Sequence, residues 1–328
     1  MITRRKLFIA LGAGALAAPL ASFAQQQPAK IYRIGFLGAE TASSDAGRVK
    51  GFRTGLRDLG YVDGVHYNIE FRWGEGKYDQ LADLAAELVR QKVDVLVTVG
   101  TKAVAGASRA TTTVPIVMAS SGDIVAVGLV TNLARPGGNI TGSTNVGREL
   151  GPKRMEMLKE VMPRIGRVAY LVNPDNPAFG PNLQAMLAAA KSLKLELQPF
   201  EVRSPDKFEN AFAEIAKRRI GGLVIQDETS FSTNAGKLAD LALEFRLLLA
   251  GGERIGDAGG LIGYGPNIGE QDRRAAIFVD KIFKGTKAGD IPIEQPTRFE
   301  LIVNMKTAKA LGIRIPQSIL VQATKVIK

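Results

Sequence analysis

The stretch that decides the fold is residues 79–109, DQLADLAAELVRQKVDVLVTVGTKAVAGASR. Its first part predicts an amphipathic helix over 79–92, because apolar residues recur there at helical spacing. That stripe consists of Leu81, Leu84, Ala85, Leu88 and Val89. Residues 93–99 form an apolar, β-branched run, which predicts a strand buried on both faces of a parallel sheet. A second helix is expected over 101–109, so the stretch indicates an α/β fold.

The same alternation of strands and helices extends over the rest of the chain. Strands are expected at 31–38, 67–73, 115–119, 167–172, 195–202, 221–225 and 299–303. A turn signal, PGGN at 136–139, breaks the rhythm before it restarts. We therefore expect two lobes of similar size, each built from repeating β-α-β units.

The lobe boundaries follow from the places where this rhythm changes. We expect one lobe at 144–264 and the other at 31–143 plus 265–328. A glycine-rich crossing segment is expected at 263–267, with the C-terminal tail returning to the first lobe.

Composition excludes several classes of chemistry. The 328 residues include no Cys and one His, so disulfides, thiolate sites and zinc sites with two imidazoles are excluded. The net charge of +11 comes from scattered Lys and Arg without a dense basic run, so we expect no nucleic-acid partner. Signatures such as G-x-S-x-G or a phosphate-binding loop are also missing. We expect neither an enzyme nor a cofactor or metal ion.

Residues 1–24 have the layout of a secretory signal peptide. A basic start, MITRRK, precedes an apolar stretch over 7–20 and small residues at Ser22 and Ala24. The run TRRKLF also resembles a twin-arginine signal, so both export routes stay open. Because no Cys is present for a lipid anchor, we expect the mature protein to be free in the periplasm.

Several short motifs together resemble one family, the tryptophan/tyrosine-type substrate-binding proteins of ABC transporters. These motifs are FRTGL (52–56), GY (60–61), YNIEFRW (67–73), LARPGGNITG (133–142), GPKR (151–154), VNP (172–174), GGLIGYGP (259–266) and FELIVN (299–304). The resemblance extends from about residue 31 to 327. The sequence departs from the family pattern at 226–231 and 247–260, where it has fewer aromatic residues. This departure argues against an indole or phenol ligand.

The resemblance implies a type I periplasmic-binding-protein fold, with two doubly wound parallel-sheet lobes, three crossing segments and a ligand cleft between the lobes. It also implies closure around a small solute and delivery of that solute to an ABC permease and its ATPase in the inner membrane. We expect the protein to be a monomer and the solute to be amino-acid-like or a carboxylate. The alternative is a ligand-sensing periplasmic module for a membrane receptor.

Candidate binding residues follow from a rule independent of the family, that ligands of open parallel sheets bind beyond the carboxyl ends of the strands. These candidates are Thr41, Asp45, Gly100, Thr101, Ser120, Ser121, Asn173, Asp227 and Tyr264. Other roles fit some of them equally: helix capping for Asp45 and Thr101, a turn for Asn173, and packing for Tyr264.

The chemistry of these residues suggests how a solute is held. Ser120, Ser121 and the helix beginning at Thr101 supply donors suited to a carboxylate. Asp227 follows a buried strand, where an acid needs a cation, so we expect it to bind a ligand ammonium. Since Asp227 would face the cleft, its removal should barely change the melting temperature of the ligand-free protein.

Overall fold

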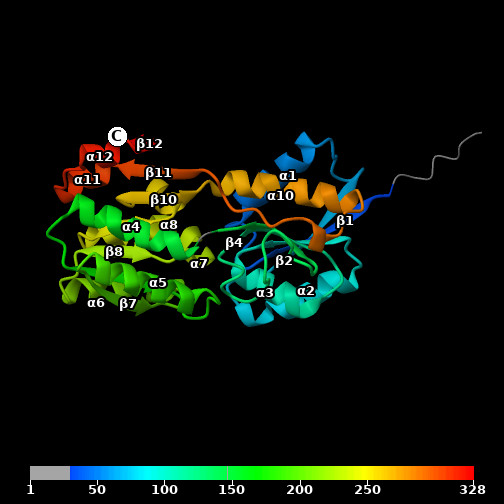
Figure 1. The fold of residues 1–328 in the computed structure, drawn as a ribbon, viewed down its shortest axis with the longest axis horizontal. Coiled ribbons are helices and arrows are strands. Elements are labelled where there is room, and N and C mark those ends of the chain that lie inside the picture. The colour runs from blue at the N-terminus through cyan, green and yellow to red at the C-terminus, as the bar shows by residue number, and fades with distance from the viewer. Residues whose placement is uncertain (1–29, 146) are drawn as a thin grey trace, which may run out of the picture.

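The computed structural model describes residues 30–145 and 147–328. They form two lobes side by side along the long axis of the molecule, each built on its own sheet (Figure 1). The expected signal peptide lies outside the described residues. Among those that are described, no helix is both long and apolar enough to cross a membrane.

The sheet of the first lobe has five parallel strands in the order β2-β1-β3-β4-β5. The strands are β1 (Tyr32–Gly38), β2 (Tyr67–Trp73), β3 (Val95–Val99), β4 (Ile116–Ser121) and β5 (Ile140–Thr144). Helices cover both faces, because the long crossovers between parallel strands carry them. One core joins the sheet to α1 (Ala46–Asp58) and α10 (Ile268–Phe283), and another joins it to α2 (Leu81–Arg90) and α3 (Thr101–Ala110).

The sheet of the second lobe has seven strands in the order β12-β11-β10-β9-β8-β6-β7. They are β6 (Arg167–Val172), β7 (Glu196–Glu201), β8 (Gly222–Ile225), β9 (Leu248–Gly251), β10 (Ile262–Pro266), β11 (Phe299–Asn304) and β12 (Lys325–Ile327). Neighbouring strands are parallel except β10 and β11.

Helices cover both faces of this second sheet as well. The core on one face includes α4 (Gly147–Val161), α5 (Phe179–Ser192), α11 (Met305–Leu311) and α12 (Gln317–Leu320). The core on the other includes α6 (Phe208–Lys217), α7 (Thr229–Thr233), α8 (Ala235–Glu244) and α9 (Glu253–Asp257). Three short 3₁₀ helices, η1 (Tyr78–Gln80), η2 (Pro205–Lys207) and η3 (Ala288–Asp290), complete the described elements.

The polypeptide passes between the lobes three times, after β5, after β10 and before β11. The helix after the second passage, α10, lies along α1 on the first lobe (Figure 1). Gly55 permits this close approach, because a Cβ there would lie 2.1 Å from the carbonyl oxygen of Arg273. The segment that follows stays on the first lobe, where the Thr141 hydroxyl donates to the carbonyl of Ile291.

The expected assignment of the whole tail 265–328 to the first lobe is wrong. Residues 268–294 pack on that lobe, but β11 pairs with β10 and β12 pairs with β11 in the second sheet. The expected crossing segment at 263–267 is mostly strand β10, and the chain crosses after it. The reason is that β10 offers β11 an unpaired edge, so the returning chain completes the second sheet.

Candidate ligand-binding site

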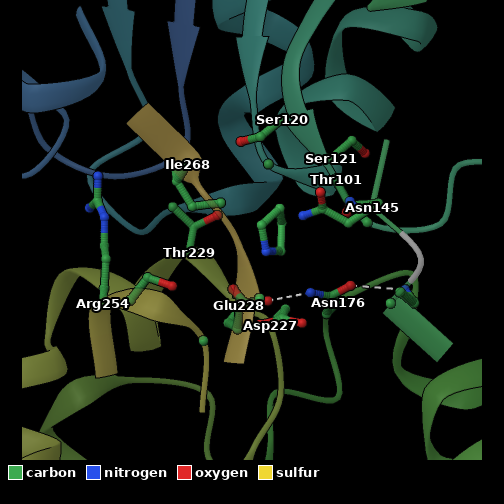
Figure 2. Close-up of a pocket in the computed structure, with 18 of the residues that line it drawn as sticks. Thr101, Ser120, Ser121, Asn145, Asn176, Asp227, Glu228, Thr229, Arg254 and Ile268 are labelled. Carbon is green, nitrogen blue, oxygen red and sulfur yellow. Dashed lines mark hydrogen bonds between the residues drawn. The ribbon is translucent and has the colours of Figure 1, made fainter. Parts of the chain in front are cut away.

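The candidate site is a cavity of about 80 Å³ between the two lobes (Figure 2). The first lobe lines it with residues at the ends of β3 and β4, and the second with residues after β8 and β9. Parallel strands present their carboxyl ends at one edge of a sheet, and ligands of open α/β sheets bind there. The two binding edges therefore face one another across the cavity.

Several helices begin at this cavity. The first residues of α3, α4 and α10 are Thr101, Gly147 and Ile268, and all three line it. A helix N-terminus carries unpaired N–H groups and about half a positive charge. No side chain caps α3, because the preceding residue is Gly100, whose φ of 84° favours glycine. Backbone donors suited to an anion are therefore available on the first lobe.

The two serines at the end of β4 differ in their hydrogen bonding. Ser120 Oγ accepts a hydrogen bond from Arg48 Nη1 at 2.9 Å. Ser121 is 2% exposed, and its hydroxyl has no hydrogen-bond partner within the described residues. Leaving a buried hydroxyl without a partner costs free energy, so a hydrogen bond from Ser121 to a group that enters the cavity is favourable.

A buried charge cluster lies behind Ser120 and holds its hydroxyl through Arg48. Arg48 lies between two carboxylates, with its Nη1 3.3 Å from Asp272 and its Nε 3.5 Å from Asp45. Burial raises the pKa of both carboxyls, and the Arg48 charge opposes that rise. Asp45 is fully buried and does not line the cavity. Arg48 does line the cavity, so within this cluster Arg48 is the residue that a solute can reach.

On the second lobe, Asp227 already has a cation. Its Oδ1 accepts from Nη2 of Arg154 at 2.8 Å, and the Arg154 side chain is 1% exposed. Arg154 Nε also donates to the carbonyl of Tyr264 at 2.8 Å. The cation that an acid at this position needs is therefore supplied by α4.

The cavity is closed on one side by an ion pair between the lobes. Lys102 on α3 has its Nζ 3.1 Å from Oε1 of Glu228, which follows β8. The other oxygen of Glu228 accepts from the amide of Asn176, as the dashed line in Figure 2 marks. Both charged side chains are buried, so the structure represents a closed arrangement of the lobes.

Four cationic side chains line the cavity within the described residues. Of these, Arg254 alone makes neither a hydrogen bond nor an ion pair with its charged group. It begins on the second lobe and extends toward the first (Figure 2). Burial lowers its pKa, and so does the charge of Arg48 on the opposite lobe. Arg254 is thus available to an anionic group in the cavity.

The family model for ABC transporter substrate binding proteins matches residues 40–327, most of the chain. The chain belongs to this family. The "Tyrosine-binding protein" of Clostridioides difficile is 24% identical over 266 residues, covering 81% of this chain and 76% of that protein.

Solved structures show the same fold. A conserved domain protein from Vibrio cholerae matches with a TM-score of 0.84 and 21% identity, covering 90% of this chain and 100% of that one. A Streptococcus pneumoniae ABC domain in complex with L-Trp matches with a TM-score of 0.82 and 23% identity, covering 91% and 100%. The substrate-binding protein therefore has the expected type I periplasmic-binding-protein fold.

Of the nine candidate residues in this substrate-binding protein, the structure brings five to the cavity: Gly100, Thr101, Ser120, Ser121 and Asp227. Their contact with a solute stays a prediction. Thr101 serves locally as well, since its hydroxyl accepts from the N–H of Gly122 at 2.9 Å.

The other four candidates lie outside the cavity lining. Thr41 is exposed in the loop after β1, where its hydroxyl accepts from the N–H of Ser44. Asp45 is buried behind Arg48, as described above. Asn173 is buried and accepts from the N–H of Asp175 within a turn. The ring of Tyr264 stacks on Phe299 at 5.8 Å between centroids.

Sequence reasoning missed the cations of the site: Arg48, Lys102, Arg154 and Arg254. Three of them belong to helices α1, α3 and α4, whereas the rule for parallel sheets points to residues that directly follow strands. One signal was present in the sequence, because Lys102 directly follows the candidate Thr101. Within the described residues, no group of three or more metal-binding side chains is found.

Proposed function

We propose that this substrate-binding protein captures a small carboxylate solute, amino-acid-like or not, between its lobes in the periplasm and delivers it to an ABC importer. The observation that carries the proposal is the set of unpaired donors at the interlobe cavity. These are the uncapped start of α3, the Ser121 hydroxyl and the Arg254 guanidinium. All three favour an anion, and a carboxylate accepts several such hydrogen bonds at once.

Asp227 supports an amino-acid-like solute. Its Oδ1 is engaged by Arg154, whereas its Oδ2 has no hydrogen bond within the described residues, and the side chain is 30% exposed. A carboxylate offers about four acceptor sites, so Asp227 retains room for a ligand ammonium. The first lobe would then bind the carboxylate and the second lobe the ammonium.

Closure of the lobes couples capture to delivery. The Lys102–Glu228 pair forms only when the lobes meet, and it lies at the cavity. A solute that bonds both lobes favours the same closed arrangement, which is the state that a permease can distinguish from the empty, open one. Delivery to a permease and its ATPase, by a monomeric mature protein, is part of this proposal.

Native mass spectrometry of the protein isolated from the periplasm tests the proposal. We expect a bound small acid that is released on unfolding and that rebinds in isothermal titration calorimetry. At a free concentration 100 times the Kd, the acid should stabilise the protein by about 2.7 kcal/mol. A bound solute without any acidic group would contradict the proposal.

A further inference from the structure

The residues that line the interlobe cavity include no aromatic side chain among those described. Apolar contact comes instead from aliphatic groups, chiefly Ile255, Pro266 and Ile268. A site for an indole, phenol or benzoate ring needs flat apolar surface, and aromatic pairs gain about 0.5–1.5 kcal/mol beyond area burial. This cavity offers no such surface.

Aromatic rings near the cavity are held by other contacts. Phe231 packs edge-on against Phe208 at 5.7 Å, and the ring of Tyr264 stacks on Phe299. Tyr78 is covered by Lys102, whose Nζ lies 3.4 Å from the ring centroid. None of these rings can turn into the cavity without losing an established contact.

The size of the cavity leads to the same conclusion. A dry apolar cavity that binds benzene measures about 150 Å³. The interlobe cavity measures about 80 Å³, which is roughly half of that. A solute smaller than a benzene ring therefore fits this space when the lobes are closed.

Contacts between the lobes hold the cavity at this size while the lobes are closed. A Cβ on Gly100 would lie 2.5 Å from Oγ1 of Thr229, so the two lobes already touch at this point. Next to it, the buried pair of Lys102 and Glu228 joins the lobes. Accommodating a ring would require the lobes to separate and would expose this ion pair to water.

We propose that the solute is a short aliphatic carboxylic acid and that the closed cavity excludes aromatic acids. The inference rests on the proposed function, because it names the class of acid. The carboxylate bonds Ser121 and the start of α3, and the short chain packs against Ile255 and Ile268. An amino group on the solute would bond Asp227, and a hydroxyl or second carboxylate would bond Arg254.

A panel of acids tests this inference on the full mature protein, unfolded and refolded to release any co-purified solute. The short acids are L-alanine, L-serine, L-lactate and succinate, and the aromatic ones are L-tryptophan, L-tyrosine and benzoate. In isothermal titration calorimetry we expect at least one short acid to bind at least tenfold more tightly than any aromatic acid. Comparison of alanine with lactate distinguishes amino acids from other short acids.

A cavity-enlarging variant tests the size limit directly. Ile268→Ala removes side-chain volume from the cavity wall, so the Kd of L-leucine relative to that of L-alanine should fall about tenfold or more. The matched control is Val321→Ala, where the Val is 69% exposed and far from the lining, and the ratio should not change.

The outcomes separate the two proposals. Binding of an aromatic acid as tight as that of every short acid, or an unchanged ratio in Ile268→Ala, would overturn this inference and leave the proposed function intact. Failure of all acids in the panel to bind would overturn this inference, whereas a co-purified solute without an acidic group would overturn the proposed function as well.

Discussion

Lys102 and Glu228 form a buried ion pair that joins the two lobes, with Nζ 3.1 Å from Oε1. Their side chains are 7% and 2% exposed. Lys102 also contacts the ring of Tyr78, and Glu228 also accepts from Asn176. Burying two charges costs free energy that only such additional contacts offset. The pair therefore depends on closure of the lobes and in turn favours it.

We expect Lys102→Ala to shift the ligand-free protein toward an open arrangement, because an unpaired Glu228 regains water only when the lobes separate. Small-angle scattering should show a larger radius of gyration, and solute binding should weaken about tenfold or more. The control is Lys217→Ala, whose exposed side chain pairs with Glu214 at 4.0 Å on one helix. An unchanged radius of gyration for Lys102→Ala would show that the pair does not determine closure.

Asp227→Ala should affect both binding and stability. Loss of a partner for a ligand ammonium should weaken binding of an amino acid by roughly 2–5 kcal/mol. The structure adds a second effect, because Arg154 is 1% exposed and would lose its carboxylate. We therefore expect the melting temperature of the ligand-free protein to fall, contrary to the expectation from sequence.

Asp227→Asn separates the two effects. The amide keeps a hydrogen-bond acceptor for Arg154 but has no charge for an ammonium, so we expect weaker binding with a smaller loss of melting temperature. If calorimetry shows that both variants bind the solute as tightly as wild type, Asp227 does not contact the ligand.

Ser121→Ala should weaken binding of a carboxylate about ten- to hundredfold, since a hydrogen bond to a charged group contributes about 1.5–3 kcal/mol. Stability should change little, because the hydroxyl has no partner in the closed structure. Thr41→Ala is the control, as it follows a strand of the same sheet yet lies outside the cavity lining. Equal losses in titration calorimetry for the two variants would contradict the placement of the site.

The buried carboxyl of Asp45 should make stability decrease as pH rises. Burial raises its pKa above the ordinary 3.8, so the folded state holds the proton more tightly than the unfolded state. This stabilisation is complete below the ordinary pKa and is lost as pH rises through the folded value. In denaturant titrations, wild type should therefore lose stability relative to Asp45→Asn as pH rises above the ordinary pKa of 3.8.

Asp206→Asn provides a control of opposite sign. A hydrogen bond from Ser204 lowers the pKa of Asp206, so its contribution is lost as pH falls instead. If wild type shows the same pH trend relative to Asp45→Asn as relative to Asp206→Asn, Asp45 is not the source of the loss of stability at higher pH.

Export is predicted from the first 24 residues, which lie outside the described part of the chain. Cleavage after Ala24 should give a periplasmic protein that begins at Gln25, which intact-mass spectrometry detects. Protein recovered from the periplasm with Met1 still present would contradict this prediction.

The sequence by itself determined the α/β class, because apolar runs such as 93–99 can only be buried within a parallel sheet covered by helices. It also located Ser121 and Asp227, since Ser121 ends β4, Asp227 follows β8 by two residues, and the binding edge of a parallel sheet follows from strand direction. These are properties of neighbouring residues in the chain.

Only the tertiary structure decided which charges meet. Lys102 and Glu228 are 126 residues apart, and Arg154 and Asp227 are 73 apart, so no spacing in the sequence predicts either pair. Tertiary structure likewise decided that β11 and β12 join the second sheet, because an unpaired strand edge is a property of the assembled sheet. Local patterns fix which segments are buried, whereas the rotation of each helix and the contact between lobes depend on packing of the whole chain.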